Sequence, residues 1–100
     1  MTYKVRLTSA AAGDLYRLYS FLLEHDLDAA ERALEAIERA FQLLVYSPFS
    51  CRKALLADNP RMREIVIPFG RAGYVALFEI EDNRTVTVLA IRHQREDDYH

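Results

Sequence analysis

The chain has 100 residues, of which 51% are hydrophobic and 28% are charged, and 13 lysines and arginines against 15 aspartates and glutamates give it a net charge of −2. We expect one domain, residues 1–100, with enough apolar material for a packed core, which excludes intrinsically disordered and low-complexity proteins. The lack of surplus positive charge argues against a protein that mainly wraps nucleic acid, because non-specific phosphate binding depends on that surplus.

Cysteine usage and hydropathy indicate the compartment. Cys51 is the only cysteine, so no disulfide can form within the chain, as is typical of proteins from reducing compartments. The N-terminus has no apolar signal-peptide core, and no stretch approaches the roughly 20 apolar residues that span a membrane. We therefore expect a cytoplasmic protein with no membrane partner.

The chain begins with the patterns of a strand and a helix. Residues 3–7 alternate apolar and charged, as in a strand with one buried face. Thr8 is a suitable cap for a helix from Ser9 to Glu24. Apolar residues recur at helical spacing within that range: Ala11, Leu15, Leu18 and Leu22. We therefore expect an amphipathic helix that packs along one side.

A second helix follows a short polar connection, residues 25–28. Asp28 and Glu31 resemble a capping box at its start, and Ser47-Pro48 ends it. Its apolar stripe is Ala30, Ala33, Leu34, Ile37, Phe41, Leu44 and Val45, and its polar stripe is Glu31, Arg32, Glu35, Glu38, Arg39 and Gln42. Because the connection is so short, the two helices should fold back on each other as a hairpin.

The second half of the chain predicts an ordered loop and three strands. Residues 48–60 have no sustained period and leave room for one helical turn. The runs 62–69, 74–80 and 85–92 have the composition of strands joined by short turns. The middle run is apolar on both faces, which predicts a central strand covered on two sides. The order β-α-α-β-β-β predicts an α+β fold, in which a helical hairpin packs on one face of a small, mainly antiparallel sheet.

A group of candidate site residues follows the last predicted strand: Arg92, His93, Arg95 and Tyr99. Cations at a strand end could hold a phosphate, and a histidine, which titrates near neutral pH, could move a proton. The alternative is a solvated tail in which Arg95 pairs with nearby acidic residues, and spacing alone favours it. Arg63 is a further candidate, because its parity places it on an apolar sheet face, where a guanidinium indicates an acidic partner or a ligand.

Metal, nucleotide and thiol chemistry are disfavoured. The 3 glycines form no phosphate-binding motif. The 3 histidines and the single cysteine have no metal-ligand spacing, so we expect no metal and no cofactor. Cys51 is interpreted as an inert loop thiol, although Arg52 and Lys53 beside it could activate a nucleophile.

Four segments of the chain together resemble one known family. They are Val5-Arg6-Leu7-Thr8 with Ala11, Asp14 and Leu15, residues 63–70 (REIVIPFG), residues 73–78 (GYVALF), and residues 88–95 (VLAIRHQR) with Tyr99. Their order, over nearly the whole chain, is similar to that of the RelE/ParE superfamily of type II toxin–antitoxin modules. The resemblance implies a small bacterial or plasmid-borne toxin that stops growth until a cognate antitoxin wraps and neutralises it.

Two activities are implied by this resemblance. RelE-like members cleave messenger RNA on the ribosome, with basic residues on the sheet and a tail histidine, arginine or tyrosine. ParE-like members share the fold, lack much of that set, and bind DNA gyrase, so that broken DNA accumulates. In both, we expect a disordered antitoxin segment that folds onto the toxin, on the apolar, two-sided strands and in the groove between the helical hairpin and the sheet.

The chain departs from the RelE-like pattern on the sheet. Val75 stands where those enzymes often have an arginine, and Val66 and Pro68 stand where they can have lysines. Missing cations remove charge stabilisation of the transition state, which is usually the largest catalytic contribution. The sequence therefore favours a ParE-like, non-enzymatic toxin that binds gyrase and forms a hetero-oligomer with its antitoxin.

Two alternatives stay open. In a metal-independent, ribosome-dependent endoribonuclease, His93 or Tyr99 would transfer the proton, and Arg63, Arg92 and Arg95 would hold the phosphate. His93, Arg95 and Tyr99 do match the tail of the RelE-like branch. A decayed toxin would only bind its antitoxin as a co-repressor.

Overall fold

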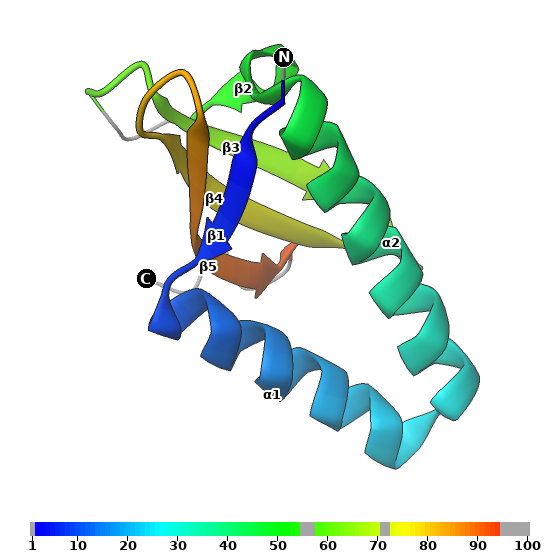
Figure 1. Cartoon of the computed structure of the whole chain (residues 1–100). Coiled ribbons are helices and arrows are strands. Elements are labelled where there is room, and N and C mark those ends of the chain that lie inside the picture. The colour runs from blue at the N-terminus through cyan, green and yellow to red at the C-terminus, as the bar shows by residue number, and fades with distance from the viewer. Residues whose placement is uncertain (1, 55–57, 71–72, 95–100) are drawn as a thin grey trace.

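The computed structural model describes residues 2–54, 58–70 and 73–94. Its elements, in chain order, are β1 (Lys4–Leu7), α1 (Ser9–His25), α2 (Leu27–Tyr46), the 3-10 helix η1 (Pro48–Ser50), β2 (Arg52–Lys53), β3 (Met62–Ile67), β4 (Tyr74–Ile80) and β5 (Thr85–His93). The strands form one sheet in the order β1-β5-β4-β3-β2. β1 is parallel to β5 and the other neighbours are antiparallel. The predicted α+β fold with a helical hairpin is confirmed (Figure 1).

Both helices pack on the same face of the sheet, which we call the covered face; the opposite one is the open face (Figure 1). On β4 the residues directed to the covered face are fully buried and alternate with half-exposed ones. The buried residues are Tyr74, Ala76, Phe78 and Ile80. The prediction that this strand is covered on two sides is therefore wrong. Val75 and Leu77 point to the open face but are also apolar, so the sequence resembles that of a strand buried on both faces. No described helix lies over these two residues.

The start of α2 differs from the prediction. Asp26 is its cap, and the Asp26 carboxylate accepts a hydrogen bond from the N–H of Ala29. The predicted capping box of Asp28 and Glu31 is therefore wrong, because Asp28 already lies in the first turn, where its charge favours the positive end of the helix. His25 ends α1, so a single residue connects the two helices.

The segment between α2 and β3 contains a strand that the sequence pattern did not predict. The expected helical turn is present as η1, but β2 then pairs with β3, placing Arg52 opposite Glu64. Their side chains form an ion pair, with Nε of Arg52 at 3.0 Å from Oε1 of Glu64. A strand of two residues is too short for its alternation to be recognised, so residues 48–60 had no detectable period.

Two polar side chains fasten α1 to β5. Thr8 caps the helix, as predicted, by accepting a hydrogen bond from the N–H of Ala11, and its hydroxyl also donates to the carbonyl of Leu89. The carboxylate of Asp14 accepts from the backbone N–H of Ile91 at 3.0 Å. β1 pairs with β5 only as far as Val88, so α1 binds backbone groups of β5 that lie beyond the end of β1.

Candidate functional site

Arg63 lies on the covered face, as its parity predicts, directly opposite Phe78 of β4. Its Nε donates to the carbonyl of Pro60 at 2.9 Å, and its Nη1 donates to the carbonyls of Cys51 at 2.9 Å and Phe49 at 3.3 Å. The guanidinium also lies 5.3 Å from the centre of the Phe49 ring, a cation–π contact. The sequence indicated an acid or a ligand at this residue; the structure instead shows backbone carbonyls, which Arg63 uses to hold the segment before β3.

His93 and Arg92 project to opposite faces of β5. His93 is paired with Tyr74 and meets its ring edge-on at 5.7 Å between centroids, and Tyr74 stacks on Phe69 at 5.6 Å. Arg92 is paired with Val75 on the open face. The sequence interpretation gathered these two residues into one cluster, but neighbours in a strand face opposite ways. Burial raises the pKa of the Tyr74 phenol.

The candidate residues also lie at different ends of the sheet. Arg63 opposes Phe78, and His93 opposes Tyr74, four positions away on β4. Four positions correspond to about 13 Å along a strand, and β3 and β5 are separated by the whole width of β4. Arg63 and His93 therefore cannot hold one phosphate group together in this arrangement. Arg95 and Tyr99 lie outside the described residues.

The surroundings of Cys51 disfavour thiol chemistry. Cys51 packs against the core, and burial raises the pKa of its thiol despite the opposing effect of the Arg63 guanidinium. A raised pKa disfavours the reactive thiolate. Among residues 2–54, 58–70 and 73–94, no three His, Cys, Asp or Glu side chains are grouped to hold a metal ion. In the same ranges no helix is long and apolar enough to cross a membrane.

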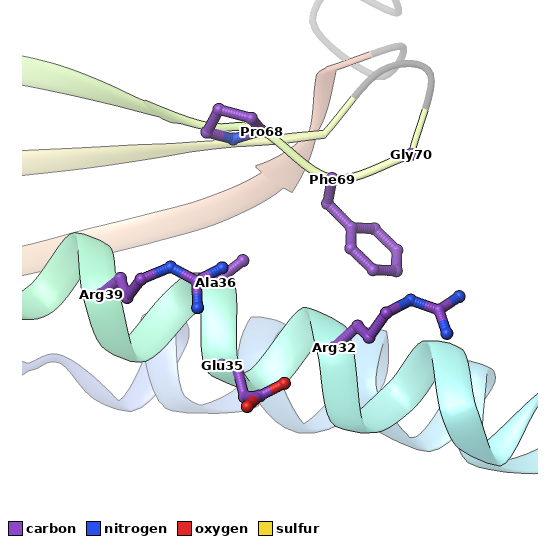
Figure 2. Close-up of a pocket in the computed structure, with 7 residues that line it drawn as sticks. All are labelled: Arg32, Glu35, Ala36, Arg39, Pro68, Phe69 and Gly70. Atoms are coloured by element: carbon purple, nitrogen blue, oxygen red, sulfur yellow. The ribbon is translucent and has the colours of Figure 1, made fainter.

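A groove runs between α2 and β3 on the covered side of the sheet edge. Its inner part, a cavity of about 280 Å³, is lined by Ala36, Arg39, Ala40, Leu43, Ile65, Val66, Ile67 and Pro68. A second cavity of about 370 Å³ continues it and is lined by Arg32, Glu35, Ala36, Arg39, Pro68, Phe69 and Gly70. Figure 2 shows the Phe69 ring pointing toward α2, with the side chain of Arg32 extended near it. The first cavity is thus mainly apolar with Arg39 at its side, and the second combines the charged residues Arg32, Glu35 and Arg39 with the Phe69 ring.

The two arginines of the groove were assigned to the outer polar stripe of their helix by the sequence. Arg32 and Arg39 are exposed, yet both line the groove. The signal that locates them is their seven-residue spacing with Ala36 between them, because residues seven apart lie on the same side of a helix. The side chain of an arginine is long enough to extend past a neighbouring alanine into the groove. Sorting the residues of the helix into one apolar and one polar stripe does not predict this.

The open face carries aliphatic residues at the centre of the sheet. Val66, Val75 and Arg92 form one cross-strand row, and Glu64, Leu77 and Ala90 form the next. Val66 is 37% exposed, and Val75 and Leu77 are half-buried. The centre of this face therefore presents methyl groups rather than cations.

A family model described as the ParE toxin of the type II toxin–antitoxin system, parDE, matches residues 5–98. The chain belongs to this family. Two curated relatives come from Caulobacter vibrioides strain CB 15. Toxin RelE3 is 36% identical over 93 residues, which is 92% of this chain and 95% of the relative, and Toxin RelE1 is 35% identical over 80 residues, 80% and 82%. The predicted membership of the RelE/ParE superfamily is confirmed.

A solved structure confirms the fold of this ParE-family toxin. A chain of the chromosomal ParDE toxin–antitoxin system from P. aeruginosa superposes with a TM-score of 0.67 at 18% identity, covering 91% of this chain and 95% of that chain. Membership of the family makes a cognate antitoxin the expected protein partner of this toxin.

Proposed function

We propose that this ParE-family toxin arrests growth by binding DNA gyrase, without enzymatic activity of its own. The proposal rests on the residues that the sheet presents. Its open face presents the aliphatic residues Val66, Val75 and Leu77, and the Arg63 guanidinium is bound to backbone carbonyls. Cleaving RNA requires cations and a proton-transfer group around one phosphate. The described residues supply no such cluster, whereas an aliphatic surface suits contact with a protein.

The direct test is inhibition of purified gyrase. We expect the toxin to inhibit DNA supercoiling in vitro and to induce the DNA-damage response when it is expressed without antitoxin. A heat-unfolded sample is the control for non-specific inhibition. Normal supercoiling together with growth arrest but no DNA damage would reject gyrase as the target.

A second candidate is a RelE-like endoribonuclease, because two relatives are named RelE toxins and His93 with Arg92 stands at the end of β5. In this alternative His93 or Tyr99 would transfer the proton, and Arg92 and Arg95 would hold the phosphate. Primer extension on a translated message tests it: cleavage that disappears in His93→Ala or Tyr99→Phe supports the alternative. Intact message in cells expressing wild-type toxin rejects it.

The antitoxin is the third part of the proposal. The groove between α2 and β3 supports it as the antitoxin site, because exposed apolar residues such as Leu43, 43% exposed, line an open cavity there. We expect a small reading frame to lie beside the toxin gene, and its product to bind the toxin and to restore growth. Toxicity that this product leaves unchanged would contradict the assignment.

A further inference from the structure

We propose that two copies of this toxin pack open face to open face, related by a two-fold axis that runs between β4 and β5. The occupant of the open face in the free toxin is thus a second copy of the same chain. The inference goes beyond the proposed function, because it does not depend on which target the toxin binds. A dimer of this kind and the proposed gyrase contact use the same face, so they exclude each other.

The centre of the open face is aliphatic on three neighbouring strands. Val75 and Leu77 lie on β4, with Val66 of β3 opposite Val75 and Ala90 of β5 opposite Leu77. Val66 is 37% exposed, and the other three are half-buried. Aliphatic side chains form no hydrogen bonds with water, so packing against a second apolar surface is favourable. The same patch on a second copy provides such a surface.

The charges around this centre are separated by sign. The exposed residues of β1 alternate with half-buried ones that pack on the core. The charged residues that β1 and β5 direct to the open face are all basic: Lys4, Arg6 and Arg92. Those that β3 and β4 direct to it are acidic: Glu64 and Glu79. A face with one basic half and one acidic half is complementary to an inverted copy of itself.

The two-fold axis follows from the strand order. β1 and β5 lie on one side of the axis, and β4 and β3 lie on the other. A rotation of 180° about a line parallel to the strands places β5 over β4 of the second copy and β1 over its β3. Leu77 then packs on Ala90 of the second copy. Because Arg6, Glu79 and Met62 belong to one cross-strand row, Arg6 lies over Met62 of the second copy, one strand spacing of about 4.8 Å from its Glu79.

The size of the face determines how strong the dimer is. Four strands about 4.8 Å apart, with β4 seven residues long, cover roughly 450 Å² on each copy, or about 900 Å² in the dimer. Stable complexes bury about 1,200–2,000 Å². The dimer is therefore weak and reversible, and toxin at a few micromolar is monomeric. Both helices lie on the covered face, so the groove between α2 and β3 stays accessible in each copy.

The experiment is sedimentation velocity of the purified toxin between about 5 and 500 μM. We expect the average sedimentation coefficient of the wild type to rise over this range. Glu79→Arg and Arg6→Glu should each weaken self-association by at least about tenfold, because each places two pairs of like charges in the interface. Glu79 is preferred to Glu64 for this test, since Glu64 also pairs with Arg52 within the chain.

The decisive sample is the charge-swapped double variant Arg6→Glu/Glu79→Arg. It has the net charge of the wild type and regains both contacts between opposite charges, so it should associate within about threefold of the wild type. An equimolar mixture of the two single variants should associate for the same reason. Glu38→Arg is the matched control: Glu38 is exposed on α2, and its replacement changes the net charge as Glu79→Arg does. It should associate like the wild type.

Circular dichroism and thermal unfolding show whether each variant folds. If a single variant does not fold, Ala90→Glu replaces it and should abolish self-association, because it places a charge against Leu77 of the second copy. A wild type that stays monomeric throughout the range overturns the proposal. Self-association that the single variants leave unchanged also overturns it, because the interface then lies elsewhere. Weakening that neither the double variant nor the mixture reverses overturns the two-fold arrangement. Inhibition of gyrase is measured separately, so its failure is distinguishable from that of the dimer.

Discussion

The two faces of β4 differ in how deeply their residues are buried. On the covered face every residue is buried, and Phe78 is 0% exposed among both helices and four strands. On the open face Val75 and Leu77 are equally apolar but only half-buried. Hydrophobicity alone therefore does not distinguish a core residue from a surface residue. Substitutions on the two faces, compared pairwise, measure the difference directly.

The largest difference is expected between Phe78→Ala and Leu77→Ala. Phe78→Ala opens a cavity in the core and should lower the free energy of unfolding by about 3–5 kcal/mol, whereas Leu77→Ala removes a partly solvated side chain and should cost about 1 kcal/mol. Urea denaturation followed by circular dichroism measures both. Equal costs would show that the open face is covered in solution, for example by a second copy of the toxin.

Arg63 and Arg52 provide the next comparison. Arg63→Ala leaves three carbonyls of residues 49–60 without their donor and should cost about 2 kcal/mol. Arg52→Ala breaks an exposed ion pair and should cost less than about 1 kcal/mol. The same denaturation measurements apply. An Arg63→Ala protein as stable as wild type would remove the structural role of this arginine and restore it as a ligand-binding candidate.

Asp14 tests the link between α1 and β5. Asp14→Ala removes the acceptor for the Ile91 N–H and should destabilise the protein by about 1 kcal/mol. Asp14→Asn keeps an oxygen acceptor and should cost less. Hydrogen exchange at the Ile91 amide provides a local readout. Protection that is unchanged in Asp14→Ala would mean that this amide has another acceptor.

The smallest effect concerns Cys51. Burial raises its pKa in the folded state above the ordinary value of 9.0, so the native state holds the thiol proton more tightly than the unfolded chain. The resulting stabilisation is present below pH 9 and is lost as pH rises above it. The midpoint of the iodoacetamide alkylation rate should lie above pH 9 in native protein and fall in urea. Arg63→Ala should raise it further, because the guanidinium lowers this pKa.

Local patterns were sufficient to predict both helices and the four longer strands. Some signals depend only on residues that are close in sequence. These are the alternation in residues 3–7, the Thr8 cap and the apolar stripes of the two helices. Asp26 was missed because Asp26 and Asp28 are both suitable caps, and only the packing of the hairpin selects between them. β2 was missed because its pairing depends on Glu64, twelve positions later.

The site was less predictable than the fold. Parity placed Arg63 on the correct face, but the carbonyls that bind it belong to an irregular segment whose path no period encodes. His93 and Arg92 are adjacent in sequence, but their side chains project to opposite faces of the sheet. The groove joins residues of α2 and β3 whose proximity is a tertiary property, so Arg32 and Arg39 gave no sequence signal beyond their spacing.

The parallel pairing of β1 with β5 has a consequence for synthesis. Lys4 is opposite Thr85 and Leu7 is opposite Val88, and β5 separates β1 from β4 in the sheet. A nascent chain that lacks β5 therefore has no strand for β1 and no anchor for Thr8 and Asp14, since both bind β5. The ribosome must release residues up to about Ile91 before this sheet closes.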